Sequence, residues 1–498
     1  MRRWRQTNLD ALTSAALDVL VVGGGIVGAG IARDAAMRGL RTGLIEQHDF
    51  ASGTSSRSSR LLHGGLRYLA QGRLKLVREA SVEKQVIHRI APHLAEPLPF
   101  IFPTFNDNRH WVLWQLKLGV KMYDLLCSGH NFGKSTWLRV DEAARKLPGL
   151  RTNGLTGAVR YFDGFTNDSR LTLDTLRSAA AHGAWLLNYC RFEHAKRDQL
   201  WNCTLHAQPE ARELNIQARA VINATGPWAD KVPHSRVKLR TTKGVHLVIP
   251  RERLPVPETV VMTEGKRILF AIPWAERTIL GTTDTDYAGA PEAVRAEPAD
   301  VSYVLEIANR FFPHSALSPA DVLATWAGVR PLLAEAHGKP SDISRSHQIL
   351  NPEPGWWDVA GGKLTTYRLI AEQTVDAVAK MFARESPTTR IGPCLTAEQP
   401  LLPAEATAGI SGIVPPKLSR TAVAHFINNE WAMHLEDIML RRTGWHYYLA
   451  PAQRRAADVA AWMAEFLGWS AADLASELAR YHQASSVVSL SPSQDPPR

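Results

Sequence analysis

Three glycines and one carboxylate near the N-terminus have the spacing of a dinucleotide site. Gly23, Gly25 and Gly28 follow a short apolar run, and Glu46 comes about 20 residues after Gly25. Gly23 allows a tight turn, Gly25 lets the backbone approach a pyrophosphate, and Gly28 lets a helix pack closely on a strand. A carboxylate at this distance accepts hydrogen bonds from an adenosine ribose. The pattern predicts a bound NAD or FAD; the alternative is a glycine-rich turn without a ligand.

The segments around these residues predict the elements that must position them. Residues 19–22 are apolar and favour a buried parallel strand, residues 28–38 favour a helix, and residues 42–45 favour the next strand. In such a βαβ unit the N-terminus of the helix faces the phosphates. We therefore expect an α/β fold with a Rossmann-like domain.

Composition and charge narrow the class of protein. The chain has 498 residues, of which 45% are hydrophobic and 21% charged, so it can bury two or three cores. The net charge is +10, but lysines and arginines are scattered and no nucleic-acid-binding motif is present, so no nucleic-acid partner is predicted. The basic N-terminus has no apolar run before Val19, and we expect a flexible tail there, not a signal peptide.

The cysteines indicate neither a metal centre nor a disulfide framework. Cys127, Cys190, Cys203 and Cys394 show no C-x-x-C spacing. A reducing cytosol is therefore the expected compartment. No set of haem or iron–sulfur ligands is present either, so electrons taken up by a flavin would pass directly to an outside acceptor.

Two longer segments extend the glycine pattern. Residues 22–34 (VGGGIVGAGIARD) and 361–371 (GGKLTTYRLIA) resemble the two signatures of the FAD-dependent, aerobic-type glycerol-3-phosphate dehydrogenase family. They lie about 330 residues apart, so the pair is more specific than either alone. Further similar segments follow in family order at residues 55–68, 223–228, 281–284 and 328–331.

The resemblance implies a reaction. FAD would be the cofactor, and sn-glycerol 3-phosphate would be oxidised to dihydroxyacetone phosphate, with a hydride passing from C2 to flavin N5 and electrons then to membrane quinone. An oxidase that uses molecular oxygen, and a flavin enzyme acting on an amine or a 2-hydroxy acid, remain alternatives because the fold is shared widely. A flavoprotein without catalytic activity, acting as a scaffold, is another.

A dianionic phosphate ester enters a water-excluded pocket only where fixed cations replace its water. We predict that Arg67, Arg330 and Lys363 bind the phosphate, and we also count Arg330 as catalytic. Tyr68 and Thr282 are expected to bind or position the substrate. The alternative for each cation is a solvated or salt-bridged surface residue.

Local sequence also predicts how two of these cations are presented. Arg330 precedes Pro331, which favours an extended loop. Lys363 opens a predicted helix whose N-terminal amides would stabilise negative charge on a reduced flavin.

Alcohol oxidation needs a base for the hydroxyl proton, and the ordinary pKa of histidine suits that role. His63 is the first candidate because it shares a loop with Arg67. His246 is the second, since it lies on a predicted strand of the substrate domain and the resembled family has a histidine there. For both, the alternative is a histidine that is hydrogen-bonded for structure alone.

The remaining cofactor candidates lie in turns. Thr54, Ser55 and Ser58 offer hydroxyl and amide donors for the pyrophosphate. Gly226 ends a strand on the adenosine side, and Gly362 and Leu364 are expected beside the flavin. Thr283 and Asp284 are expected to position neighbouring groups.

The family-like segments suggest a discontinuous organisation. We expect an FAD-binding domain formed by residues 15–95, 155–235 and 320–385, and an antiparallel, β-rich substrate domain formed by residues 96–154 and 236–319. A Pro- and Gly-rich linker leads to a small helical C-terminal domain at residues 400–484, shorter than in the family. Residues 485–498 are expected to be disordered. A homodimer is left open.

One predicted helix suggests a membrane partner. Residues 110–126 place Trp111, Trp114, Leu118, Met122 and Leu125 at helical spacing, with Lys117 and Lys121 on another side. The segment is too short and too charged to span a bilayer. We expect peripheral attachment to the anionic inner face of the cell membrane; the alternative is a helix that packs this row on its own domain.

Overall fold

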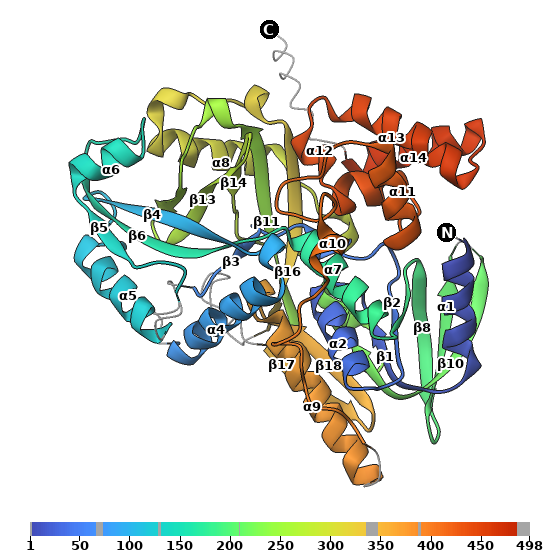
Figure 1. The fold of residues 1–498 in the computed structure, drawn as a ribbon. Helices are drawn as coiled ribbons and strands as arrows, with labels where there is room; N and C mark the ends of the chain where they lie inside the picture. Colours follow the sequence, from blue (N-terminus) through green and yellow to red (C-terminus); the bar gives the residue numbers. More distant parts are fainter. Residues whose placement is uncertain are drawn as a thin grey trace.

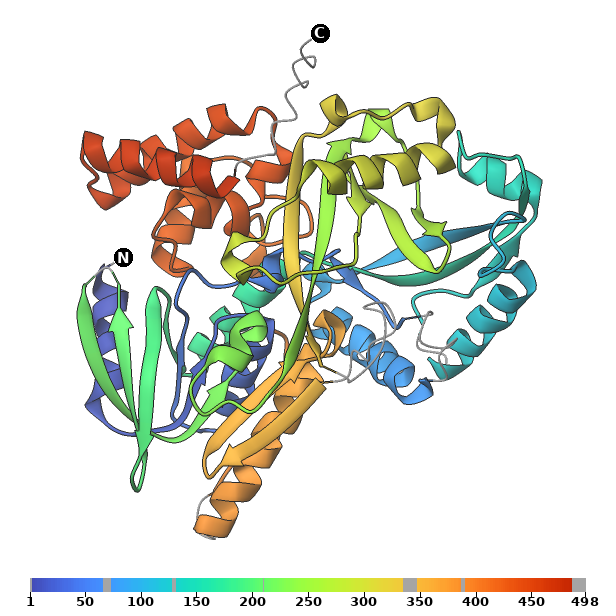
Figure 2. The same ribbon diagram turned by 180° about the vertical axis from the view of Figure 1, so that it is seen from behind.

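The computed structural model describes residues 2–65, 73–127, 131–208, 210–334, 347–386 and 390–485. Within them the chain forms two β-sheets and a group of C-terminal helices (Figures 1 and 2). The expected α/β fold, with a Rossmann-like domain, an antiparallel β-rich domain and a helical C-terminal domain, is confirmed. No helix among the described residues is long and apolar enough to cross a bilayer.

The first sheet contains the predicted βαβ unit. Its path runs β17-β18-β10-β1-β2-β7, and β1 pairs in parallel with β2 and β10. Its strands are β1 (Leu17–Val22), β2 (Thr42–Ile45), β7 (Trp185–Leu187), β8 (Cys190–Arg197), β9 (Trp201–Ala207), β10 (Arg212–Asn223), β17 (His347–Glu353) and β18 (Trp356–Gly361). β1 and β2 are buried throughout or nearly so, as strands covered on both faces are.

Helices cover one face of this sheet. α2 (Ile26–Met37), α7 (Asp168–Ala181) and α9 (Tyr367–Glu385) pack together over it. A side chain at Gly30 would crowd Tyr367 of α9, so the small residues of α2 allow this close packing. The other face carries α1 (Arg2–Ser14) and the β8-β9 hairpin.

The N-terminal helix α1 replaces the expected flexible tail. Leu9 and Leu12 are buried in the core under the sheet, and buried Arg5 pairs with Glu210 at 2.7 Å. The prediction of a flexible basic tail is therefore wrong, because two leucines one turn apart and one paired arginine fix the helix on the sheet.

The second sheet is largely antiparallel, and its path runs β15-β11-β14-β13-β12-β4-β6-β3, with β16 on β11 and β5 on β6. Its strands are β3 (Leu61–Leu62), β4 (Glu96–Phe105), β5 (Thr136–Leu138), β6 (Leu155–Phe165), β11 (Leu239–Pro250), β12 (Thr259–Glu264), β13 (Arg267–Trp274), β14 (Arg277–Gly281), β15 (Thr285–Asp286) and β16 (Ala324–Leu333). Around it lie α4 (Leu74–Ile90), α5 (Leu113–Leu126), α6 (Val140–Lys146) and α8 (Pro298–Phe311).

Strand pairing divides the chain at slightly different residues from those we expected. β6 and β16 begin segments that we placed in the FAD-binding domain, yet β6 pairs with β4 and β16 pairs with β11 of the second sheet. Arg330 therefore lies within a strand and not in a loop: Pro331 lacks an N–H, but Thr242 still pairs with Arg330 in the ladder.

The C-terminal helices are α10 (Ala404–Thr407), α11 (Arg420–Asn429), η10 (Asp437–Arg442), α12 (Trp445–Tyr448), α13 (Ala452–Leu467) and α14 (Ala471–Ser485), which confirm the predicted helical character. They pack around their own apolar core, which includes Phe426, Met439 and Trp445. Figure 1 shows them, in red, beside the N-terminus and the first sheet. Arg67, Tyr68 and all but Ser485 of the expected tail lie outside the described residues.

Candidate active site

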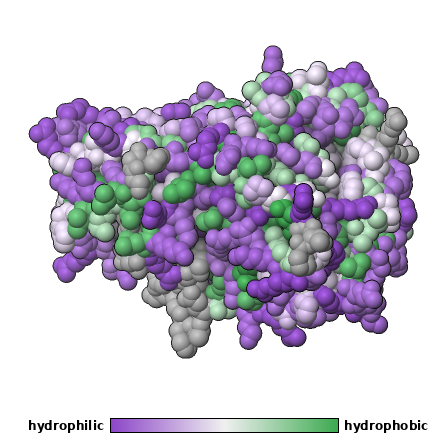
Figure 3. Space-filling model, turned by 60° about the horizontal axis from the view of Figure 1, so that its bottom comes forward, coloured by the Kyte–Doolittle hydropathy of each residue, from purple (hydrophilic) through white to green (hydrophobic). Residues whose placement is uncertain are grey.

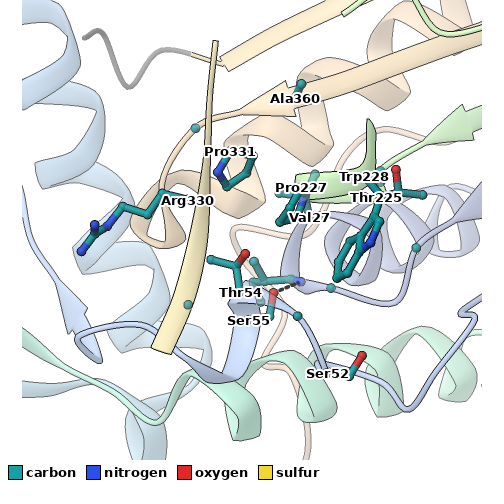
Figure 4. A pocket seen from close by; sticks show the side chains of 18 of the residues that line it. Val27, Ser52, Thr54, Ser55, Thr225, Pro227, Trp228, Arg330, Pro331 and Ala360 are labelled. Carbon is teal, nitrogen blue, oxygen red and sulfur yellow. Dashed lines mark hydrogen bonds between the residues drawn. The ribbon is translucent and has the colours of Figure 1, made fainter. Parts of the chain in front are cut away.

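A cavity of about 580 Å³ lies between the two sheets, at the carboxyl end of β1. Residues of β1 and β18 line one side and residues of β11 and β16 the other. In Figure 4, Arg330 lies at one end, Thr225 and Trp228 lie at the other, and Thr54 and Ser55 lie between them. Ligand sites occupy this position in α/β folds, at the carboxyl ends of parallel strands.

The glycine turn opens one wall of the cavity. Gly23 has a φ of 114°, and an added Cβ would lie 2.6 Å from the carbonyl oxygen of Ala224. Gly25 faces the cavity, where only the Ser55 hydroxyl comes near. Gly28 does not line the cavity; a side chain there would overlap the carbonyl of Gly23, so its place is in helix–strand packing.

Glu46 directly follows β2 and lines the cavity beside the glycine turn. Its carboxylate accepts the N–H groups of Gly24 at 2.8 Å and His48 at 2.9 Å. Burial raises the pKa of Glu46, while these backbone donors oppose the rise. The carboxylate is thus held at the end of the cavity where Cys190 to Glu193 and Gly226 also lie.

The loop at residues 54–60 crosses the middle of the cavity. The Ser55 hydroxyl accepts the Ile26 N–H at the start of α2 (Figure 4). The Thr54 hydroxyl donates to the Val329 carbonyl at 2.6 Å. Ser58 lines the cavity, and its N–H donates to Asp168. This loop therefore joins α2 to β16.

His246 lies buried on β11 at the end of the cavity nearer Arg330. Its Nε2 is 2.8 Å from the Ser59 hydroxyl, and its ring stacks on Trp326 with centroids 5.1 Å apart. Its Nδ1 has no hydrogen-bond partner among the described residues. Burial, with a further contribution from Arg330 and Arg60, holds the pKa of His246 well below its usual value. The ring is thus a neutral base at ordinary pH.

Arg330 is held in place by the turn after β14. Its guanidinium donates to the Thr282 hydroxyl at 2.9 Å and pairs with Asp284 at 3.2 Å, and it lies over Gly244. Thr282 itself does not line the cavity. The structure therefore places Thr282 and Asp284 as supports of Arg330.

The turn that carries Lys363 also lines the cavity. Gly362 has a φ of 86°, and Lys363, which is 9% exposed, and Leu364 follow it along the cavity wall. Short helical turn η9 (Leu364–Thr366) leads from Lys363 into α9. The Thr365 hydroxyl accepts the His63 N–H at 3.1 Å, so His63, which also lines the cavity, is held beside this turn.

Sequence reasoning missed two charged groups in the wall. Arg57 lines the cavity, and its guanidinium makes no hydrogen bond to another described residue. Buried Asp168, at the start of α7, accepts the Ser58 N–H at 2.8 Å, and burial raises its pKa. Arg57 lies, with Ser58, inside the family-like segment at residues 55–68, which could have pointed to it. No motif in the sequence marks Asp168.

These features fit FAD. The lining combines a buried carboxylate, glycines beside the start of a helix, and cations with a buried histidine. These are the groups that adenosine, pyrophosphate and flavin would require. Gly25 and Gly226 have no side chains, so the wall leaves room at both positions for the cofactor.

Comparison with known proteins agrees with this geometry. A model of the FAD dependent oxidoreductase family matches residues 18–377, and a model of the C-terminal domain of alpha-glycerophosphate oxidase matches residues 414–474. A glycerol-3-phosphate dehydrogenase of Mycobacterium leprae is 34% identical, covering 96% of this chain and 89% of that protein. An aerobic glycerol-3-phosphate dehydrogenase of Bacillus subtilis is 36% identical, and the match covers 80% of this chain and 73% of that protein.

A solved structure is similar throughout. The glycerol-3-phosphate dehydrogenase of Bacillus halodurans, complexed with FAD, covers 97% of each chain with a TM-score of 0.74 and 28% identity. Fold, cavity and family match together define an FAD-dependent oxidoreductase, and FAD is its cofactor. Within that class, the chain belongs to the glycerol-3-phosphate dehydrogenase family.

Proposed function

We propose that this protein oxidises sn-glycerol 3-phosphate to dihydroxyacetone phosphate and passes the electrons to membrane quinone. The observation that carries the proposal is that Arg330, Lys363, His63 and His246 line one cavity. A phosphate dianion needs fixed cations, and oxidation of an alcohol needs a base; the cavity wall offers both.

In this proposal each residue has one task. Arg330 and Lys363 bind the phosphate, and Thr282 and Asp284 hold the Arg330 guanidinium in place. His246 takes the hydroxyl proton, because its ring is neutral and buried. This reverses the order expected from the sequence, in which His63 came first; we now place His63 second because His246 is the buried, neutral ring. FAD, when bound, supplies the hydride acceptor.

The direct test is flavin reduction without oxygen. Purified holoprotein is mixed anaerobically with glycerol 3-phosphate, and the absorbance of the oxidised flavin is followed. We expect bleaching with glycerol 3-phosphate and none with glycerol, which lacks the phosphate. Failure of glycerol 3-phosphate to bleach the flavin refutes the proposal and leaves an amine or 2-hydroxy acid oxidoreductase, or a flavoprotein without catalytic activity.

The electron acceptor is tested separately. The reduced protein is mixed in a stopped-flow instrument with oxygen or with a soluble quinone analogue at the same concentration. We expect faster reoxidation by the quinone. Faster reoxidation by oxygen would instead identify a glycerol-3-phosphate oxidase.

Attachment to a membrane is supported by the outer face of α5. Trp114, Leu118, Met122 and Leu125 are 64%, 56%, 41% and 78% exposed, and Trp137 beside them is 54% exposed. Trp111, the first member of the predicted row, instead packs against Phe102, so the alternative of a row packed on its own domain holds for Trp111 and not for the other four side chains of the row. The opposite face of α5, with Leu116, Val120 and Tyr123, is the one that is buried.

Basic groups accompany the exposed row. The amines of Lys117 and Lys121 lie 5.4 and 5.7 Å from the centre of the Trp137 ring. Figure 3 brings the lower side of the molecule forward, and apolar side chains gather at its left, where Figure 1 places α5. Aromatic and aliphatic groups beside lysines suit an anionic lipid surface, and quinone lies dissolved in that surface.

A further inference from the structure

A buried charged cluster lies behind the loop that carries His63. The carboxylate oxygen Oδ1 of Asp163, on β6, accepts the Lys84 amine at 2.9 Å and the Tyr123 hydroxyl at 2.5 Å. Lys84 belongs to α4 and Tyr123 to the inner face of α5, and all three side chains are 3% exposed or less. None of them lines the cavity.

The same oxygen also holds the backbone of the loop. Oδ1 of Asp163 accepts the Gly64 N–H at 3.2 Å, directly after His63. Any side chain at Gly64 would overlap the Tyr123 hydroxyl, so the loop lies against this hydroxyl. On its other side the loop is held by Thr365, which follows Lys363.

Burying this charged cluster costs free energy, so a contribution to folding stability alone does not explain it. Moving two charges from water into the protein interior costs several kcal/mol per ion. A protein in which apolar residues of similar size replace a buried ion pair is often as stable as the original. Burial and the neighbouring Asp163 raise the pKa of Tyr123 well above its usual value, so its hydroxyl stays a proton donor. A carboxylate oxygen fixed by two side-chain donors holds its third partner, the Gly64 amide, in one place.

We infer that Tyr123, Asp163 and Lys84 are positioning residues, which fix the Gly64 amide and thereby the His63 side of the substrate pocket. The inference rests on the proposed function for the task of His63, but the geometry of the loop does not depend on it. Nothing in the proposed reaction requires these three residues to touch substrate or FAD.

The test compares two tyrosines in the same core. Tyr123→Phe removes the hydroxyl that Asp163 accepts. Tyr161→Phe is the matched control, because Tyr161 is also buried, stacks on Phe100, and its hydroxyl has no hydrogen bond within the described residues. Asp163→Asn is a second, stronger change; should that variant fail to fold, the tyrosine pair alone decides.

Two measurements are made on the holoproteins. Hydrogen–deuterium exchange of a peptide that covers residues 61–65 should quicken in Tyr123→Phe and not in Tyr161→Phe. Anaerobic bleaching at saturating glycerol 3-phosphate should slow about tenfold or more in Tyr123→Phe, while bleaching by dithionite is unchanged, because only the substrate reaction needs the loop.

The outcomes separate the two claims. Equal exchange and equal bleaching in the two tyrosine variants overturn the positioning inference. If glycerol 3-phosphate bleaches no protein at all, the proposed function fails, and the exchange measurement still decides whether the cluster fixes the loop.

Discussion

At the scale of single residues, the site depends on how side chains hold one another. Ser59 fixes one nitrogen of the His246 ring, and Trp326 fixes its plane. Buried Arg60, in turn, lies over the rings of Trp274 and Trp326, with its guanidinium 4.4 and 5.1 Å from their centres. His246 thus sits in a rigid wall, and its remaining nitrogen is the one without a partner among the described residues.

His246 should set the pH dependence of the reaction. Burial, Arg330 and Arg60 hold its pKa well below the usual 6.5, so the neutral, proton-accepting form persists as the pH falls through 6.5. The bleaching rate at saturating substrate should therefore stay level from pH 8 to 6.5 and fall only in more acid solution. His246→Gln should lower this rate about 100-fold or more.

Two results would overturn this assignment. One is an acid limb centred at or above pH 6.5 in the unaltered protein. The other is a His246→Gln variant that keeps its rate while His63→Gln loses it, which would make His63 the base.

Arg330 should determine affinity for the phosphate. Arg330→Ala removes two charge-assisted donors and should raise KM for glycerol 3-phosphate about 100-fold. Arg240→Ala is the control, because Arg240 lies on neighbouring β11 and pairs with Asp286 at 2.8 Å outside the cavity. A nearly unchanged KM in Arg330→Ala, measured by steady-state kinetics, would favour a substrate without phosphate.

At the scale of elements, α5 has two faces with different partners. Tyr123 on its inner face belongs to the cluster behind the His63 loop, whereas Leu118 and Leu125 on its outer face are exposed. Sequence periodicity predicted the helix but could not tell which face the domain would cover, since both faces carry apolar residues. The answer depends on β6 and α4, which are distant in the chain.

The outer face of α5 should bind anionic vesicles. Leu118→Glu with Leu125→Glu puts charge where burial in lipid needs apolar groups, and should abolish sedimentation with vesicles that contain anionic lipid. Phe466→Glu, at an exposed apolar position on α13, serves as the control and should sediment normally. Equal sedimentation of the two variants would show that α5 is not the attachment site.

At the scale of the whole molecule, the C-terminal helices are joined to the cofactor loop by buried charges. Asp49, three residues after Glu46, is paired with Arg441 and Arg442, and neighbouring Phe50 packs edge-on against Trp431. A side chain at Gly24 would in turn collide with Phe50. The C-terminal domain therefore supports the glycine turn without lining the cavity.

Breaking this link should weaken cofactor retention. Arg442→Met leaves the Asp49 carboxylate buried with one cation fewer, which costs about 3 kcal/mol. We expect FAD to be lost at lower temperature in a thermal melt followed by flavin fluorescence. Arg420→Met, which removes an exposed pair with Glu465, should melt like the unaltered protein, and identical melts of both variants would contradict the link.

The features that could be predicted from the sequence are those that depend on residues close together in the chain. We could predict the glycine turn together with β1, α2 and β2, because glycine spacing and apolar runs are visible within a few neighbouring residues. The roles of Asp168, of Arg57 and of Asp49 with its partners Arg441 and Arg442 could not be predicted, because they arise where segments distant in the chain come together. The α1 helix was missed for the same reason: Glu210, the partner of Arg5, lies about 200 residues away.

The central claim is that two cations from separate elements, Arg330 on β16 and Lys363 in the turn after β18, bind a phosphate ester beside the flavin. A crystal structure of the protein with FAD and dihydroxyacetone phosphate tests it most directly. We predict the phosphate between Arg330 and Lys363, with the carbonyl carbon facing the flavin and the carbonyl oxygen within hydrogen-bond reach of His246 or His63. A phosphate bound elsewhere, or a flavin whose ring lies away from these side chains, would contradict the account.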